Sequence, residues 1–397
     1  MQNAHAPAVA VVAERASAYG RGFIRGIADF AAAHDDWNME LIDPADLPRH
    51  LAVPFDGWIV RSPDVRALRR LARLGRPVVD ALYAHPIPSF AAVRTDNVGI
   101  GRLAARHFLS RRFASFAYCG YRRVLFSDLR RDGYARELKA NGFRTAIFRP
   151  VYDPARRYGR GVLLGEHLGA SPDAAELAAW LAAWLARLPR PLAVFCCDDV
   201  RAAEVLRLAR RRCLRVPDDV AVLGVDDDPS YCMFSSPRLS SVDPDAHGIG
   251  VAAAEALAAM LAAPQAPLPA VRHIPPRGVV ARASTLAYPG LPPWFPQALA
   301  FIREHVGEGI SAADVFRHAG YSRTLVERAF AKALGHSVQR EIAQVRVERA
   351  RRLLRQTAKP VREVAALCGY ASVEYFSRAF AAATGAPPAR YRASGGA

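Results

Sequence analysis

The sequence lacks long apolar stretches, a disulfide framework and an excess of acidic residues. No uncharged run approaches the roughly 18 residues that a membrane span needs. The short apolar run at 8–13 is followed at once by Glu14 and Arg15, which is not the layout of a secretory signal. The six cysteines show no CxxC spacing, so they fit reduced, mostly buried thiols. We therefore expect a cytoplasmic protein without a membrane partner.

The shortage of acidic residues is uneven along the chain. The sequence has 54 basic and 37 acidic residues, a net charge of +17 and a pI near 10.2. Residues 301–397 hold 16 of those basic residues but only 8 of the acidic ones, so about half of the excess lies in the last quarter. A basic segment favours nucleic acid through counterion release from phosphates. The alternative is a merely solvated surface in an arginine-rich chain, and charge alone leaves both open.

The first 286 residues alternate short apolar runs with amphipathic stretches, which predicts parallel sheets covered on both faces. A chain of 397 residues should hold two or three domains, and this part is long enough for two lobes. The predicted strands are 8–13, 39–42, 57–60, 77–79, 91–93, 115–118, 145–148, 192–196 and 220–225. The predicted helices are 19–33, 65–74, 98–109, 131–141, 173–187, 200–212 and 249–261.

Polar side chains follow several of these strands. In open parallel sheets, ligands bind outside the carboxyl ends of the strands. Asn97 lies there beside Asp96, and Arg130 stands at the expected start of a helix. The acids found there are Asp96, Asp198, Asp199, Asp226, Asp227 and Asp228. Carboxylates accept hydrogen bonds from hydroxyls and arginine donates in a fixed fork, so the set suits a polyhydroxylated ligand. Each acid taken alone could equally be a helix N-cap.

One pattern appears twice in the last hundred residues, at 315–335 and at 364–385. Each copy reads as a helix, a tight turn opened by glycine, a capping serine and a second helix, which is the helix-turn-helix pattern. A helix over 337–356 joins the copies and spans roughly 30 Å, close to the ~34 Å between successive major-groove faces on one side of B-DNA. The segment before them, 287–296, is rich in proline and predicts a stiff linker.

The outward residues of each second helix are the candidates for contact with DNA bases. In the first copy they are Arg323, Thr324, Glu327, Arg328 and Lys332, and in the second Val373, Glu374, Ser377 and Arg378. The pair Glu374 and Arg378 has the i, i+4 spacing of an intrahelical ion pair, which is the alternative to base contact.

Residues 1–286 resemble the effector domain of LacI/GalR-type regulators. The resemblance rests on VFCCDD at 194–199, RVPDDVAVLGVDD at 215–227 and PRLSSV at 237–242. It implies the periplasmic-binding-protein fold, two α/β lobes joined by three crossings. It also implies that Asp198 and Asp226 bond sugar hydroxyls, that Arg130 and Asp96 join them, and that the loop ending at Tyr19 completes the site. Such regulators carry their DNA-binding unit before this domain, whereas here the helix-turn-helix pattern follows it.

Residues 297–397 resemble the AraC/XylS-type DNA-binding domain. The specific signature is VAALCGY at 364–370, YFSRAF at 375–380 and GAPPARYR at 385–392. The order of the two parts is that of xylose-operon regulators. It implies a sugar-responsive activator of carbohydrate catabolic genes, with a pentose such as xylose as effector. The partners implied are operator DNA, a second copy of the chain in a homodimer, and RNA polymerase.

Two other functions compete with this one. A non-specific architectural DNA binder would also need basic helix-turn-helix units. An enzyme on a dinucleotide-type sheet would need G-x-G-x-x-G, and the glycines at 20–26 and at 159–165 miss that spacing by one residue. We predict no catalytic residue, no metal ligand and no cofactor.

Overall fold

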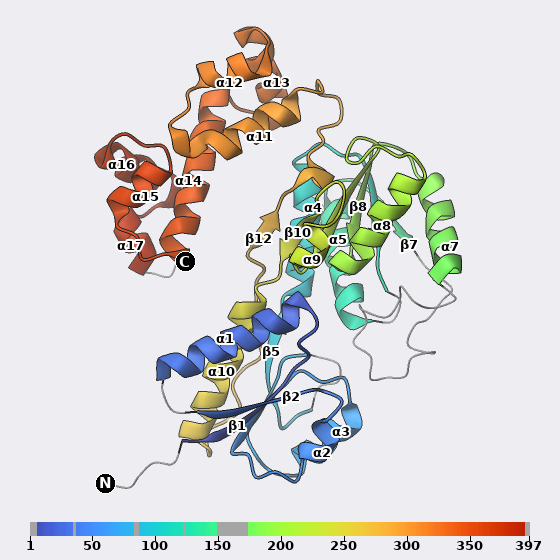
Figure 1. Ribbon diagram of the computed structural model, residues 1–397, viewed down its shortest axis with the longest axis vertical. Coiled ribbons are helices and arrows are strands. Elements are labelled where there is room, and N and C mark those ends of the chain that lie inside the picture. The colour runs from blue at the N-terminus through green and yellow to red at the C-terminus, as the bar shows by residue number, and fades with distance from the viewer. Residues whose placement is uncertain (1–5, 35–36, 83–86, 122–123, 149–173, 394–397) are drawn as a thin grey trace. The chain divides into compact units, whose positions relative to one another are not determined.

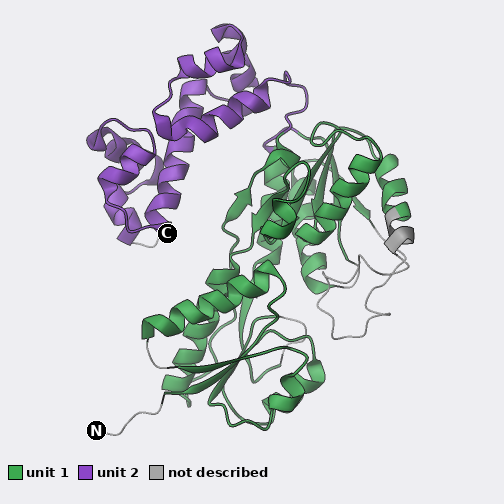
Figure 2. Cartoon of the chain, in the orientation of Figure 1, with its two compact units in different colours: residues 1–109, 113–286 green, residues 110–112, 287–397 purple. Residues whose placement is uncertain are grey.

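The computed structural model describes residues 6–34, 37–82, 87–121, 124–148 and 174–393. Figure 2 shows two compact units, residues 1–109 with 113–286 and residues 110–112 with 287–397. The first unit is α/β with two lobes and the second is all helical (Figure 1), as the alternation and the repeat predict. The second glycine pattern, at 159–165, lies outside the described residues.

The N-terminal lobe is built on a six-stranded sheet of order β11-β5-β4-β3-β1-β2, whose described strands pair in parallel. Its strands are β1 Ala8–Val12, β2 Asn38–Ile42, β3 Gly57–Val60, β4 Val78–Asp80, β5 Ala91–Thr95 and β11 Arg272–Ile274. Its helices are α1 Ala18–His34, α2 Leu47–His50, α3 Val65–Ala72 and α10 Ala246–Ala262.

Side chains that alternate along β1 divide this lobe into two cores. Val9 and Val11 pack with α1 and α10, whereas Ala10 and Val12 pack with α2 and α3. Such burial on both faces is why the strand reads as an unbroken apolar run. The helices α1 and α10 approach closely at Gly26, where a Cβ would lie 2.1 Å from the carbonyl oxygen of His247. The first glycine pattern therefore belongs to a packed helix pair.

The C-terminal lobe repeats this plan with a sheet of order β12-β10-β9-β8-β6-β7. Among its described strands, β12 alone pairs antiparallel, with β10. The strands are β6 Ser115–Cys119, β7 Thr145–Phe148, β8 Leu192–Cys196, β9 Val220–Val225, β10 Ser240–Asp243 and β12 Gly278–Val280. The helices are α4 Asn97–Leu109, α5 Leu125–Ala140, α7 Ala174–Ala186, α8 Asp199–Arg211, α9 Pro229–Cys232 and the 3₁₀ helix η2 Ala283–Thr285.

The chain crosses between the lobes three times. It passes from β5 into α4, from β10 into α10, and from β11 into β12. These three crossings are those that the resemblance implies. The first and second follow strand ends directly, so the residues around Asp96 and Asp243 belong to the junction of both lobes.

The helical unit contains α11 Phe295–His305, η3 Val306–Glu308, α12 Ala312–Ala319, α13 Arg323–Leu334, α14 Val338–Gln356, α15 Val361–Leu367, α16 Val373–Thr384 and α17 Pro388–Ala393. Ser322, Ser337 and Ser372 each accept a hydrogen bond from a backbone N–H in the first turn of the helix that follows. These are N-caps. The repeat therefore encodes helix starts as well as helices.

Three details differ from the sequence prediction. Helix α5 begins at Leu125, not near residue 131, so Arg130 lies in its second turn; the N-cap residue Val124 offers no side-chain oxygen that could mark the start. Strands β10 and β11 were not predicted, because both are short and carry polar residues. In the predicted linker, Tyr288 and Trp294 are buried in the core of the helical unit, and α11 begins at Phe295.

Candidate functional site

Residues from three strand ends of the N-terminal lobe gather around Tyr19. This tyrosine lies in the first turn of α1, and its hydroxyl is 2.8 Å from the hydroxyl oxygen of Thr95 at the end of β5. The guanidinium of Arg61, which follows β3, lies 4.4 Å from the centre of the Tyr19 ring. Arg61 also forms an ion pair with Glu14, which follows β1. Thr95 thus holds the Tyr19 hydroxyl, and the Arg61 cation holds the Tyr19 ring.

Arg130 provides the corresponding charge from the C-terminal lobe. Its side chain is only 5% exposed and donates from Nε to Oδ1 of Asn97 at 2.9 Å. It also donates to the carbonyl oxygen of Cys197 at the end of β8, and its Nη2 lies 3.8 Å from Oδ1 of Asp226. A guanidinium with these contacts has a fixed position, and it brings Asp226 and the first lobe crossing together.

The loop after β9 has unusual backbone geometry. Asp226 and Asp227 adopt φ values of +107° and +47°, which residues other than glycine rarely adopt. The loop is held by its own amides: Asp226 N–H donates to the carbonyl of Val242 (3.0 Å) and Asp227 N–H to the hydroxyl of Ser241 (3.0 Å). Asp228 N–H donates to Asp199 Oδ2 at 2.8 Å. Strain of this kind is typical of functional sites.

The adjacent acids Asp198 and Asp199 have different surroundings. Asp198 caps α8 by accepting from the N–H of Arg201 at 2.8 Å. Asp199 is 1% exposed, and its carboxylate accepts from Asp228 N–H, from the hydroxyl of Ser241 at 2.7 Å and from the Cys232 thiol. Its oxygens are occupied by the protein. Asp199 therefore positions the loop at 226–228.

Asp96 also fills the role that the N-cap alternative describes. Its Oδ1 accepts from the N–H of Gly99 at 2.7 Å, in the first turn of α4. The neighbouring Asn97 makes the contact with Arg130. Asp96 thus lies at the first crossing, one residue from the site.

Burial changes the acidity of the carboxyl groups. It raises the pKa of Asp226 to about 7, against the lowering effect of Arg130 and with the help of Asp198. Burial also raises the pKa of Asp198 and, further, that of Asp199, where Asp226 adds repulsion. Arg130 lowers the pKa of both Asp226 and Asp198, and Asp198 raises the pKa of Asp226. The three side chains therefore lie close to one another.

The sequence did not single out Arg61 or Glu14, whereas Asn97 and Asp228 are among the polar residues that it places after strands. Asp228 meets the N-terminal lobe: its Oδ2 accepts from the N–H of Ala18 at 3.3 Å and lies 3.9 Å from Nη2 of Arg21. The rule that examines polar residues after strands could have found Arg61 and Glu14, since both stand one or two residues beyond a strand end.

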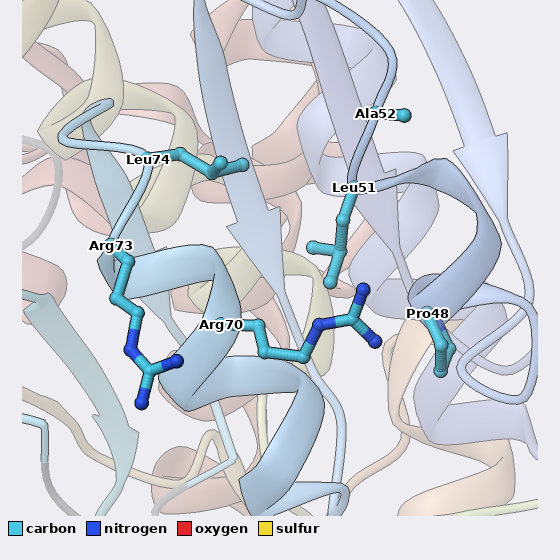
Figure 3. A pocket seen from close by; sticks show the side chains of 6 residues that line it. All are labelled: Pro48, Leu51, Ala52, Arg70, Arg73 and Leu74. Atoms are coloured by element: carbon cyan, nitrogen blue, oxygen red, sulfur yellow. The ribbon is translucent and has the colours of Figure 1, made fainter.

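A separate hollow lies on the N-terminal lobe between α2 and α3 (Figure 3). It is lined by Pro48, Leu51, Ala52, Arg70, Arg73 and Leu74. None of these residues belongs to the cluster around Tyr19 and Asp226. Within the described part of the chain, no group of three histidine, cysteine or acidic side chains could hold a metal ion. None of the described helices is long and apolar enough to cross a bilayer.

The two second helices of the repeat, α13 and α16, expose the residues that the sequence assigns to DNA. Arg323, Thr324 and Arg328 are exposed on α13, as are Glu374 and Arg378 on α16, whereas Val373 and Ser377 are half-buried. On α13, Val326 is in the core, whereas its neighbour Leu325 is 38% exposed. The equivalent residue on α16 is Tyr375, which is 57% exposed and was not predicted to be outward.

Three of the predicted DNA contacts also have partners within the helical unit. Lys332 donates from Nζ to the carbonyl of Gly290 at 3.0 Å, and Glu327 accepts from the N–H of Val338 at 3.2 Å. Glu374 accepts from the hydroxyl of Ser372 at 2.6 Å, which lowers its pKa more than Arg378 does. No ion pair joins Glu374 to Arg378 among the residues that the structure describes.

Comparison with known proteins matches both units. A family model described as a periplasmic binding protein-like domain covers residues 105–285, and one described as a helix-turn-helix domain covers residues 315–394. The Xylose operon regulatory protein of Escherichia coli (strain K12) is 28% identical over 383 residues, 94% of each chain. That of Haemophilus influenzae is 25% identical over 378 residues, 91% of this chain and 92% of the relative. The chain is a transcription regulator of this two-part type.

The fold of this regulator also matches solved structures. The structure of the xylose-binding transcription activator XylR has a TM-score of 0.60 at 24% identity, and the match covers 98% of both chains. A CelR–cellobiose complex matches with a TM-score of 0.56 at 21% identity, over 70% of this chain and 84% of that one. The predicted fold class, a two-lobed periplasmic-binding-protein-like domain followed by a double helix-turn-helix domain, is confirmed.

Proposed function

We propose that this regulator binds a sugar through the first unit and a specific DNA sequence through the helical unit. The observation that carries the proposal is the cluster of Tyr19, Arg130 and Asp226, which comes from both lobes. Tyr19 and Arg130 bond residues at the ends of β5 and β8, and Asp226 follows β9. A closed arrangement of the lobes around a ligand would alter the free energy of the DNA-binding state only if the sugar prefers that arrangement.

The chemistry of the cluster suits a small polyol. The Asp226 and Asp198 carboxylates accept hydrogen bonds from ring hydroxyls, and Arg130 donates to ring or hydroxyl oxygens. Tyr19, which is 7% exposed, fixes Thr95 and Arg61 on the N-terminal side of the cluster. We assign Asp96 to the margin of the site and Asp199 to positioning. The names of the relatives favour a pentose, and we propose D-xylose as the first candidate.

The helical unit supplies the DNA contacts in this proposal. Arg323, Thr324 and Arg328 on α13, and Arg378 on α16, are exposed and unencumbered by the contacts described above for Lys332, Glu327 and Glu374. Arginine bonds the O6 and N7 of guanine in a bidentate manner, which gives specificity. We further propose a cytoplasmic homodimer that activates carbohydrate catabolic genes together with RNA polymerase. The structural relative XylR is described as an activator, which supports this direction of regulation.

The two competing functions make different demands. An architectural protein would bind DNA without sequence preference and ignore sugars. An enzyme would need a phosphate-binding glycine loop, and the glycines of the first pattern lie inside α1, where Gly26 packs against α10. Because its relatives are regulators, we propose a regulatory and not a catalytic role.

Thermal unfolding of the full chain with a panel of pentoses and hexoses tests the effector. A sugar present at about 100 times its Kd should stabilise the folded state by about 2.7 kcal/mol. Arg130→Met, which keeps an unbranched side chain but removes the guanidinium donors, should lose the response. Absence of any sugar response in the wild type, with DNA binding unchanged by every sugar, would contradict the effector role.

A further inference from the structure

The two helix-turn-helix units have separate cores and share one helix. The first core, around Phe330, takes Val338 and Ile342 from the start of α14; the second, around Phe376, takes Ala350 and Leu354 from its end. Helix α14 has 19 residues and is about 28 Å long at ~1.5 Å per residue. A single shared helix would leave the units free to bend about it.

A second contact joins the units away from α14. The turn after α11, comprising η3 and Gly309, meets the turn between α15 and α16 at Gly369. A Cβ at Gly369 would lie 2.2 Å from the carbonyl oxygen of Val306 and 2.8 Å from the N–H nitrogen of Gly309. Gly309 and Gly369 both have positive φ, +77° and +74°, so the two turns touch through bare backbone.

Arg346 bridges this contact from the middle of α14. Its Nη2 donates to the carbonyl of Ile310, in the first helix-turn-helix unit, at 3.1 Å. Its guanidinium carbon lies 5.2 Å from the centre of the ring of Tyr370, which is buried in the second helix-turn-helix unit. One side chain therefore contacts both units, next to the point where their turns meet.

We propose that Arg346 and Gly369 lock the two units into one rigid reader and thereby set the spacing between the two DNA half-sites that the protein accepts. Attachment at two points, α14 and the turn contact, fixes the separation of α13 and α16 and also their relative rotation. A rigid reader tolerates no change in spacing, because one inserted base pair rotates the second half-site by about 34–36°. If the two units can bend relative to each other, the second recognition helix can still reach its shifted half-site, with only a modest loss of its effective concentration at the DNA and hence of affinity. The proposal rests on the DNA-reading role given above.

The first test measures spacing. The full-length wild type selects its preferred duplex from random sequences, and one to three base pairs are then inserted between the two half-sites. We expect one insertion to weaken wild-type binding about tenfold or more, because one recognition helix can then no longer reach its bases. In Arg346→Met the same insertion should weaken binding by only about threefold, because a flexible reader can follow it.

Arg351→Met is the matched control. It removes the same charge from the same helix, but Arg351 donates to the carbonyl of Ala383 at 3.3 Å, within the second helix-turn-helix unit alone. It should keep the wild-type response to insertion. Gly369→Ala forces the turns apart and should behave like Arg346→Met.

The second test needs no DNA. The exposed Cys213 is replaced by serine, and spin labels are placed on Ala331→Cys in α13 and Ala382→Cys in α16; the other cysteines are buried. The distribution of label distances should be narrow in the parent chain and in Arg351→Met, and broad in Arg346→Met and Gly369→Ala. Narrow distributions in all four, or an unchanged insertion response in both Arg346→Met and Gly369→Ala, would overturn the proposal. If the wild type selects no sequence at all, the DNA-reading role fails and the distances alone decide.

Discussion

Replacing Asp226 with asparagine should stabilise the protein at alkaline pH. Burial raises the pKa of this carboxyl from 3.8 to about 7. The folded state therefore holds a proton that the unfolded state has released between about pH 4 and pH 7, and the free energy of unfolding falls as the pH rises through that window. Asparagine carries no titrating group and tolerates positive φ better than most residues, which suits the +107° of this position.

The size of the effect follows from the pKa. At about 1.36 kcal/mol per pH unit, the rise to about 7 corresponds to an upper limit of roughly 4 kcal/mol above pH 7. The Asp226 side chain is 25% exposed, so water solvates part of its charge and reduces the destabilisation. We therefore expect a gain in stability of about 2 kcal/mol. For a unit of this size, at ~2.1 cal/mol/K of unfolding entropy per residue, that equals about 3 °C in Tm.

Calorimetric unfolding of the full chain at pH 5, 6, 7 and 8 measures this directly. The difference in Tm between Asp226→Asn and wild type should grow from pH 5 to pH 8, with the variant the more stable protein at pH 8. Asp218→Asn, which removes an acidic charge from outside the site, should follow the wild type throughout. Parallel curves for Asp226→Asn and wild type would refute the reasoning, as would a variant less stable at pH 8.

The remaining predictions concern single contacts. Asp199→Ala leaves the Asp228 N–H and the Ser241 hydroxyl without their buried acceptor, so denaturant unfolding should show a loss of about 3 kcal/mol or more. Gly26→Ala places a methyl group 2.1 Å from a carbonyl of α10 and should cost about 1–3 kcal/mol in the same assay. Arg378→Ala should weaken binding to the preferred duplex by about 1–3 kcal/mol and relax selection at one base pair, seen in competition gel shifts. Uniform weakening across all duplexes would instead assign Arg378 to a phosphate.

The fold could be predicted where burial on both faces makes a strand apolar along its whole length. All five residues of β8 are buried, and the sequence marks that strand clearly. Strand β10 is equally buried at Ser240 and Ser241, but their hydroxyls bond to Thr285 and Asp199. Those partners lie more than forty residues away in the chain. A polar strand whose side chains are satisfied at such distances has no local signature.

The site could be predicted only in part, for a similar reason. The rule about strand ends directs attention to Asp198, Asp199 and Asp226, but it cannot say which way each carboxylate points. The N-cap geometry of Asp198 places the next residue inside α8, so Asp199 faces β10 and α9. Two adjacent acids thus take different roles. Such a division depends on the packing of four elements and not on the sequence around them.

The two copies of the repeat illustrate the same limit on the DNA side. Glu327 and Lys332 of the first copy hold α14 and Gly290, while the equivalent positions of the second copy are Ser377 and Ala382. The turn tyrosine of the first copy, Tyr321, is 49% exposed and stacks on Trp294; that of the second copy is buried beside Arg346. One sequence pattern therefore produces equal helices with unequal surroundings. Because outward polar groups of α13 are already bonded to the scaffold, we expect base selection there to depend on fewer side chains, and the two half-sites to differ in sequence despite the internal repeat.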